Sequence, residues 1–432
     1  MVNNINQLLE KARAAHDAGD WSRVLQCLQK LIQEENALDP EIVKNQAYLL
    51  ELALSILEMG DFQQRWEIAK VFVRLGNVAI TPLIDILQDE DASELRWYAV
   101  RILGDLKNPK AIASLVEFLQ TTDDEELKAI AAAALGQIGQ SAIAALSELL
   151  TSVDTRILAV RSLSYIRQPE IITPLLNVVQ DPLVEIRAIA IEALSSFHDS
   201  RIPPILLNAL TDVAAAVRRE AVLGLSVRTD LHQELDLLAK LQPRLYDFNL
   251  EVAQAAAIAL SRIGSDEAAK HLFIVLISPP TPIKLQLEII RALSWMKTLS
   301  GLEYLQQAFN QLSYTTLWLE IVTVLGRVSD STLTASSTEI LLSIVRSQHP
   351  AVEIASIKSA IALSLGQLGN IEAIEPLISL LADNNQVVRL HIVAALKNLA
   401  PETAYQQLQQ LLNNPTLTPD LRKGVTAALA EW

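Results

Sequence analysis

Residues 79–106 read AITPLIDILQDEDASELRWYAVRILGDL, and residues 373–399 read AIEPLISLLADNNQVVRLHIVAALKNL. Both stretches open with Ala-Ile-x-Pro-Leu-Ile, pass through a turn rich in Asp or Asn, and continue with apolar residues at i, i+3, i+4 and i+7. This periodicity predicts two amphipathic helices in each stretch. Pro82 and Pro376 stand near the start of the first helix, where a missing N–H costs nothing. Each hairpin has an apolar face that only a neighbouring hairpin can cover, which is typical of an α-solenoid.

The same pattern recurs along most of the chain at a mean spacing of about 32 residues. Each copy is marked by an anchor leucine, which is usually followed by Gly or Ser. We expect these anchors to be buried, and they are Leu75, Leu103, Leu135, Leu163, Leu194, Leu225, Leu260, Leu293, Leu325, Leu365, Leu396 and Leu429. Positions in a repeat are counted below from its anchor leucine as zero.

Position −7 is basic in most repeats, at Arg96, Lys128, Arg156, Arg187, Arg218, Lys358, Arg389 and Arg422. Asp181, Asp212 and Asp383 stand six residues before three of these, in the turn between the two helices. An Asp there can cap its helix and pair with the basic residue of its own or the next repeat, so we expect a structural ladder along the stack. The pattern is interrupted in three consecutive repeats, which carry Ala253, Gln286 and Trp318 instead.

The motif (Val/Ile/Leu)-Arg-x-x-Ala-x-x-Ala-Leu-(Gly/Ser) resembles HEAT repeats, and more narrowly the phycobilisome-lyase HEAT-like repeats. Ile186-Arg187 through Ala193-Leu194 and Val388-Arg389 through Ala395-Leu396 match it best. The resemblance covers roughly residues 63–432 and implies an all-α, right-handed α-solenoid of about twelve hairpins. The family includes phycobilin lyases, bilin-handling chaperones, scaffolds and a branch of metal-dependent hydroxylases.

The N-terminal segment has a different signature. Gly19-Asp20-Trp21 and Gly60-Asp61-Phe62 each separate two helical stretches, with Gly in a left-handed conformation expected to end one helix and Asp to cap the next. This resembles tetratricopeptide-type helix pairs. We therefore expect residues 1–62 to form a capping segment and residues 63–432 to form the solenoid. A polar loop is expected at residues 329–338, where the repeat is longer than average.

Composition excludes several classes of function. The net charge of −15 argues against a nucleic-acid partner, because phosphate contacts need clustered Lys and Arg. No uncharged apolar run approaches the length of a membrane-spanning helix, and the N-terminus does not resemble a secretory signal. The single cysteine, Cys27, excludes a disulfide framework or a multi-cysteine metal site and favours the cytoplasm. The hydroxylase branch binds iron through His-Glu dipeptides, and none of the six histidines is followed by Glu, so we expect no metal, no cofactor and no hydroxylase activity.

The second helix of each hairpin should line one groove, with positions −2 and −5 on its surface. These positions, with the neighbouring Trp97, give a mixed charged strip as the candidate partner-binding groove: Trp97, Tyr98, Arg101, Arg161, Glu192, Glu220, Glu288, Arg291 and Glu320. Its arginines would attract a carboxylate on a ligand or an acidic patch on a protein. Aromatic residues outside the regular pattern give an alternative partner site at Trp295, Tyr314 and Trp318.

Two functions fit these observations. The first is a non-catalytic scaffold or assembly chaperone that binds another protein through its groove. The second, which the family resemblance implies, is a phycobilin lyase or bilin-handling protein whose partner is a phycobiliprotein. There the propionates of a tetrapyrrole would bind Arg101, Arg161 or Arg291, with Glu220 or Glu288 aiding protonation or orientation. The sequence identifies no catalytic residues.

Overall fold

The computed structural model describes residues 2–32, 40–89, 93–347 and 349–432. Helices are the regular elements of these ranges, and no strand occurs among them, so the predicted all-α solenoid is confirmed. The chain divides into two compact units, Met1–Asp199 and Ser200–Trp432. This division lies inside the predicted repeat array, and the helices on either side of residue 62 pack together in the first unit.

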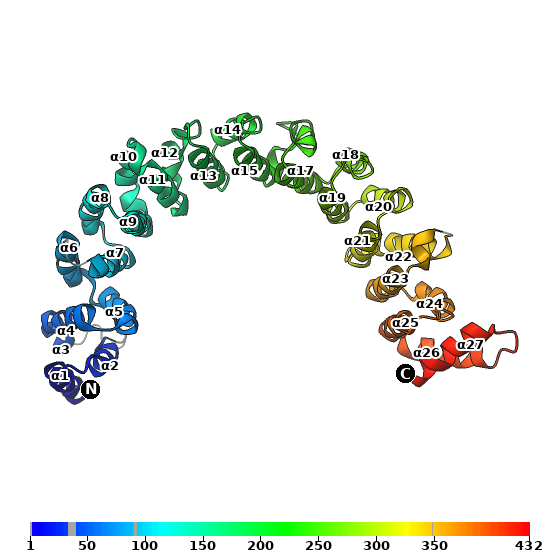
Figure 1. Ribbon diagram of the computed structural model, residues 1–432, viewed down its shortest axis with the longest axis horizontal. Coiled ribbons are helices and arrows are strands. Elements are labelled where there is room, and N and C mark those ends of the chain that lie inside the picture. Colours follow the sequence, from blue (N-terminus) through cyan, green and yellow to red (C-terminus); the bar gives the residue numbers. More distant parts are fainter. Residues whose placement is uncertain (1, 33–39, 90–92, 348) are drawn as a thin grey trace. The chain divides into compact units, whose positions relative to one another are not determined.

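The first unit contains thirteen helices in the described ranges, most of them paired into antiparallel hairpins (Figure 1). They are α1 (Val2–Asp17), α2 (Trp21–Leu31), α3 (Pro40–Lys44), α4 (Gln46–Met59), α5 (Phe62–Leu75), α6 (Ile80–Gln88), α7 (Ser93–Leu106), α8 (Ile112–Thr121), α9 (Glu125–Ile138), α10 (Ile143–Leu149), α11 (Val153–Tyr165), α12 (Ile172–Leu176) and α13 (Val184–Leu194).

The second unit repeats the same hairpin plan. Its helices in the described ranges are α14 (Ile202–Ala209), α15 (Ala215–Ser226), α16 (Leu237–Leu241), α17 (Leu250–Ile263), α18 (Asp266–Leu276), α19 (Ile283–Trp295), α20 (Leu299–Gln311), α21 (Thr315–Gly326), α22 (Ser331–Arg346), α23 (Ala355–Leu368), α24 (Ile374–Leu380), α25 (Gln386–Leu399), α26 (Pro401–Leu412) and α27 (Pro419–Ala430). We call the first helix of a hairpin its A helix and the second, which carries the anchor leucine, its B helix.

Within each unit the B helices form one layer and pack directly on one another, as α7 does on α9 and α21 on α23 (Figure 1). The anchor leucines lie in this packed layer. All of them except Leu429 are at most 4% exposed. Leu429 is half-buried, while the adjacent Ala428 takes the buried position in the last B helix.

The small residue after the anchor has a packing role. A Cβ added to Gly104 would stand 2.8 Å from the Cα atom of Ala134 on the next B helix, and one added to Gly326 would stand 2.4 Å from the Cβ atom of Ser364. Ala134 and Ser364 each precede the anchor of the following repeat. Consecutive B helices therefore approach most closely where the residue at +1 of one meets the residue at −1 of the next.

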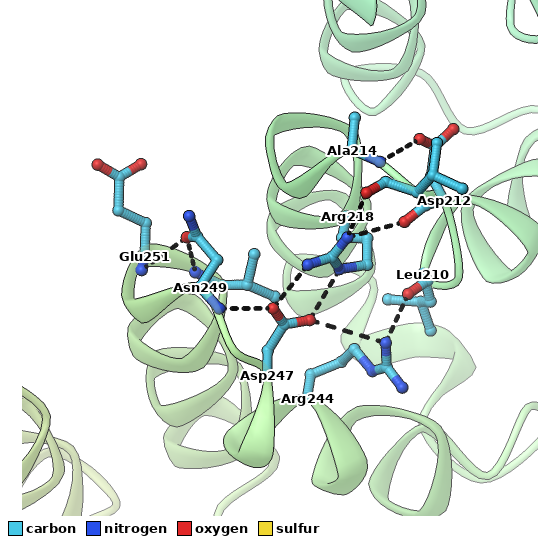
Figure 2. A network of polar contacts seen from close by, with 10 residues as sticks. Leu210, Asp212, Ala214, Arg218, Arg244, Asp247, Asn249 and Glu251 are labelled. Carbon is cyan, nitrogen blue, oxygen red and sulfur yellow. Dashed lines mark hydrogen bonds and ion pairs between the residues drawn. The ribbon is translucent and has the colours of Figure 1, made fainter. Parts of the chain in front are cut away.

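The predicted ladder is present in both units, and Figure 2 shows one step of it. Arg218 donates from Nη1 to the backbone oxygens of Asp212 and Val213, which closes the turn of its own hairpin. From Nε and Nη2 it donates to both carboxylate oxygens of Asp247 in the next hairpin, at 2.8 and 2.7 Å. Asp247 in turn accepts from the backbone N–H of Asn249. One arginine thus holds two successive turns.

Equivalent ladder contacts occur elsewhere. Arg156 binds Asp181 at 2.7 Å in the first unit, and Lys358 binds Asp383 at 2.6 Å in the second. In two of the three repeats that lack a basic residue at position −7, the side chain at that position still donates to carbonyls at the end of the A helix. Gln286 donates to Leu276, and the Trp318 indole donates to Phe309 and Leu312.

The capping predictions hold at both N-terminal Gly-Asp pairs, although one glycine differs from expectation. Asp20 caps α2, and Asp61 forms a capping box with Gln64 at the start of α5. Gly19 has the expected positive φ, whereas Gly60 is extended, with φ of −73°. Gly60 is instead confined by close approach, because a Cβ there would stand 2.4 Å from the carbonyl oxygen of Ile56.

The expected polar loop at residues 329–338 is wrong, because α22 begins at Ser331. Asp330 accepts hydrogen bonds from the backbone and hydroxyl of Thr332 and so caps this helix. Ser337 and Thr338 are buried, and they donate to the carbonyl oxygens of Leu325 and Thr334. Their hydroxyls are therefore satisfied by the backbone, which allows a polar sequence to be helical and packed.

Two helical stretches, at residues 62–88 and 125–149, have the length and composition of a membrane-spanning helix. Each of them consists of a B helix, a 3₁₀ turn and the next A helix. Gly76 and Gly139 have positive φ at these turns, which ends the first helix, and 39% and 44% of the apolar windows are buried in the fold. We interpret both stretches as core helices of the solenoid.

Candidate functional site

The predicted strip maps onto the B layer, but its two positions differ in depth. The −2 residues Arg161 and Glu192 are exposed, whereas Arg101 and Arg291 are half-buried. The −5 residues lie deeper: Glu220, Glu288 and Glu320 are half-buried, and Tyr98 is buried at 2% exposure. Tyr98 is therefore not on the groove surface as predicted, because its ring packs against Phe62 on α5 and Trp97 on α7.

Aromatic residues concentrate where α5 and α7 lie side by side in the first unit. Arg101 places its guanidinium carbon 3.5 Å from the centroid of the Trp66 ring and 5.7 Å from that of Trp97. Phe62 stacks on Trp66 with 6.2 Å between centroids and is 67% exposed. We call Phe62, Trp66, Trp97, Tyr98 and Arg101 the α5–α7 aromatic cluster.

Charges around this cluster are arranged unevenly. Arg65 pairs with Glu94 at 2.7 Å and also donates to the backbone oxygen of Glu58. Burial, and secondarily the Glu94 carboxylate, raise the pKa of Tyr98, so its phenol stays neutral at physiological pH. Among the described residues, no carboxylate lies within ion-pairing distance of Arg101. Its guanidinium stacks on an indole face and keeps its N–H groups available at the edges.

Arg161, the second predicted arginine of the first unit, forms an ion pair. It donates to the carboxylate of Glu185 on the next B helix, with both side chains about half-exposed. An exposed pair of this kind contributes little to stability. Arg161 thus differs from Arg101, because its charge is already matched within the fold.

In the second unit two of the predicted acids pair with the predicted Arg291. Arg291 binds Glu320 of the next B helix at 2.6 Å and lies 3.6 Å from Glu288. These carboxylates raise the pKa of Arg291, which keeps it charged. Glu220 lies 2.8 Å from Arg219. Arg291, Glu288 and Glu320 thus satisfy much of one another's charge, whereas Glu220 pairs with a residue outside the predicted strip.

The three aromatic residues of the alternative site do not come together. Trp318 is only 9% exposed, and its indole serves the hairpin turn described above, so it is a core residue. Tyr314 and Trp295 are exposed, but Tyr314 immediately precedes α21 and Trp295 ends α19. Because successive B helices run in the same direction, these two residues lie at opposite edges of the layer. Trp295 instead lines a cavity of about 770 Å³ with Arg291 and Glu320.

Phe62 and Trp66 were missed by sequence reasoning. Phe62 follows the Gly60-Asp61 pair and lies outside the groove positions, and Trp66 lies outside positions −2 and −5 of its repeat. The sequence did contain a signal for this cluster: residues 62–101 hold Phe62, Trp66, Phe72, Trp97 and Tyr98, in a chain that is only 5% aromatic.

Among the described residues, no group of three or more His, Cys, Asp or Glu side chains is arranged to hold a metal ion.

This architecture defines the class: a repeat protein built of stacked helical hairpins. A family model described as HEAT repeats matches residues 80–155, 143–226 and 338–430, which together exceed half of the chain. The chain belongs to the HEAT-repeat family. No curated protein matches the chain.

Solved structures agree with this fold. Importin beta in an ammonium sulfate condition is 14% identical, with a TM-score of 0.52, over 96% of this chain and 63% of its own. A full-length AP-3 complex in an intermediate open conformation is 13% identical, with a TM-score of 0.50, over 99% of this chain and 92% of its own. The complex of CpcE and CpcF of phycocyanin lyase from Nostoc is 21% identical over 54% of this chain and 94% of its own, with a TM-score of 0.31. At 13–14% identity, the likeness to importin beta and to the AP-3 complex is one of fold.

Proposed function

We propose that this protein is a non-catalytic scaffold or assembly chaperone that binds another protein through the B layer of its first unit. The observation that carries the proposal is the α5–α7 aromatic cluster. It combines Trp, Tyr, Phe and Arg, which are the residue types typical of protein-interface hot spots. It also exposes Phe62 and leaves the Arg101 guanidinium without a carboxylate partner among the described residues.

The geometry of Arg101 indicates the chemistry of the partner. A guanidinium that stacks on Trp66 through its face can still bind a carboxylate through its edge, with two parallel N–H···O bonds. Phe62 and Trp66 offer an apolar surface beside it. A partner segment with an apolar side chain next to an Asp or Glu would satisfy both features.

Partner capture with matched variants tests this proposal. Full-length protein, Trp66→Ala and Arg101→Glu are used as baits, with Arg161→Glu as the control, because Arg161 carries the same charge on the same layer but is already paired. We expect a partner whose recovery falls in both cluster variants but not in the control. With that partner purified, the affinity should fall at least tenfold, or about 1.4 kcal/mol.

A folding control accompanies the binding measurement. Loss of the Arg101–Trp66 contact should cost about 1 kcal/mol or less, as is usual for a solvent-accessible cation–π pair. Circular dichroism should therefore show folded variants. Equal affinities for the cluster variants, the control and the unmodified protein would contradict this binding site.

A phycobilin lyase or bilin-handling protein is the second candidate. Arg101 favours it, because its guanidinium has no carboxylate partner among the described residues and lies 3.5 Å from the Trp66 ring centroid, so the site could hold a propionate beside a conjugated ring system. Arg161 and Arg291 suit a propionate less well, because Glu185 and Glu320 already bind them. Mixing the protein with a linear tetrapyrrole and recording the visible absorbance tests this candidate. An unshifted band would eliminate it, and a shift that Arg101→Glu leaves intact would place the bilin elsewhere.

A further inference from the structure

A second site lies in the second unit, where α19, α21 and the start of α22 surround a cavity of about 770 Å³. This size suits a small organic ligand. The wall includes the ring of Trp295, which is 56% exposed. Val324 and Leu333, which are largely buried, and Val328 supply apolar surface. The cavity thus offers a planar aromatic wall next to apolar side chains.

Three cations and two carboxylates line the same cavity, and the carboxylates are largely engaged. Glu320 binds Arg291, and Asp330 caps α22 by accepting from the Thr332 backbone and hydroxyl. The remaining cations are Lys297 and Arg327, both exposed. Among the described residues neither has a carboxylate within ion-pairing distance, although Lys297 acts on Asp330 from farther away.

The backbone of Lys297 adds a second observation. It lies four residues after its anchor leucine and has φ of +53°. The equivalent position in other repeats is Gly139, Gly264 or Gly369, each with positive φ. A lysine in this conformation carries a strain of roughly 1 kcal/mol that glycine would avoid. Lys297 is exposed and lines the cavity, and Lys107 occupies the same repeat position with φ of +50°.

We propose that this cavity binds a small aromatic anion, whose ring lies against Trp295 and whose anionic group is held by Lys297 and Arg327. The charges support an anion, because Glu320 is paired with Arg291 and Asp330 caps α22, whereas Lys297 and Arg327 have no carboxylate within ion-pairing distance among the described residues. The exposed indole supports a planar ring, since stacked aromatic pairs are favourable beyond their buried area. This site is independent of the α5–α7 aromatic cluster and of any protein partner.

The test uses the fluorescent anion 8-anilinonaphthalene-1-sulfonate and its neutral analogue N-phenyl-1-naphthylamine as probes of the full-length protein. Trp295→Ala should weaken binding of both probes at least tenfold. The double variant Lys297→Asn, Arg327→Gln should weaken only the anionic probe by that factor. Asn suits a left-handed backbone, so this variant removes charge without new strain. Tyr314→Ala is the control, because it removes an exposed aromatic residue of the same unit outside the cavity.

Each result decides between outcomes. Anionic-probe affinity that survives Trp295→Ala and the double variant would overturn the site. An equal loss of both probes in the double variant would overturn the requirement for an anion. A loss in Tyr314→Ala as large as in Trp295→Ala would show general surface binding and overturn the site. If Trp295→Ala fails to fold, the double variant still tests the site, because Lys297 and Arg327 are exposed. Energy transfer from tryptophan to the bound probe then shows whether the probe binds close to a tryptophan.

Discussion

At position −7 the hydrogen-bond donor matters more than the charge. Arg218, Gln286 and Trp318 are chemically unlike, yet each donates N–H groups to carbonyls at the turn of its own hairpin. These carbonyls lie in the last turn of the A helix or just after it, where carbonyl groups lack intrahelical partners, so an unfilled position would leave buried acceptors. Only a basic residue can also bind the Asp of the next hairpin. The ladder therefore combines two interactions. Several side chains can donate hydrogen bonds to the turn of their own hairpin, but only Lys or Arg can also form an ion pair with the next hairpin.

Asp247→Asn should destabilise the second unit. Asp247 is 4% exposed in its side chain and binds Arg218, which is 15% exposed. Removing the carboxylate charge leaves the guanidinium with a weaker partner in a poorly solvated place, at a cost of about 3 kcal/mol. Urea unfolding followed by circular dichroism measures this difference. Glu251→Gln is a matched control, because Glu251 is exposed and next to the same turn. A midpoint equal to that of the control would contradict the role of the ladder.

The same pair predicts a pH dependence. Hydrogen bonds from Arg218, opposed by burial, hold the pKa of Asp247 below its ordinary value in the folded state. Since the folded pKa is lower than the unfolded one, the unfolded state binds protons first as the pH falls. The stabilisation is therefore complete above the unfolded pKa, near 4, and is lost as the pH falls through the folded value. Asp247→Asn should show a shallower loss of stability below about pH 4 than the unmodified protein.

At the scale of the element, packing of B helices overrides helix propensity. Gly104 lies inside α7, where glycine is normally unfavourable. The backbone of α9 approaches it so closely that no Cβ fits without a shift. The Gly or Ser that recurs after the anchor leucine therefore allows two B helices to pack closely and does not mark the end of a helix.

Gly104→Ala should consequently destabilise the protein, although alanine favours an isolated helix. Propensity alone predicts a gain of roughly 0.5–1 kcal/mol, whereas overpacking predicts a loss of about 1–3 kcal/mol. Ala133→Gly is the complementary variant. Ala133 is at an exposed position of α9, so only the lower helix propensity of glycine should affect stability there. Thermal unfolding should show both variants below the unmodified protein. A stabilised Gly104→Ala would mean that the two helices separate easily.

Sequence periodicity predicted the hairpins, the buried anchors and the ladder, because the residues that form them recur at fixed positions of the repeat. It failed where a contact joins different repeats in a way that the spacing does not encode. Trp66 and Arg101 meet because α5 packs on α7. The helix at Ser331 forms because buried hydroxyls find backbone acceptors in the preceding helix and their own. The depth of Tyr98 likewise depends on Phe62 of the neighbouring helix.

At the scale of the whole molecule, the strong helix contacts among the described residues lie within a hairpin or between hairpins that are neighbours in sequence. Inside each unit they join successive B helices, an A helix to its own B helix or to the next A helix, or a B helix to the A helix that follows it. Long-range order is thus a sum of local interfaces, and the stability of such an array is approximately a sum of repeat and nearest-neighbour terms. The destabilising effect of a mutation should therefore be largest in its own and the adjacent hairpins and should decrease with distance along the chain.

Leu325→Ala tests this locality. Leu325 is fully buried on α21, so its truncation should cost about 2–5 kcal/mol through lost burial and a residual cavity. Because α21 packs on α19 and α23, amide hydrogen exchange should accelerate most in those three B helices and in the A helices of their hairpins. Exchange in α7 and α9 of the first unit should remain unchanged.

Leu103→Ala is the reciprocal variant, since Leu103 is equally buried on α7. This substitution should accelerate exchange in α7 and leave exchange in α21 unchanged. An equal acceleration throughout the chain in either variant would mean that the repeats unfold as one cooperative body, and the nearest-neighbour description would then be wrong.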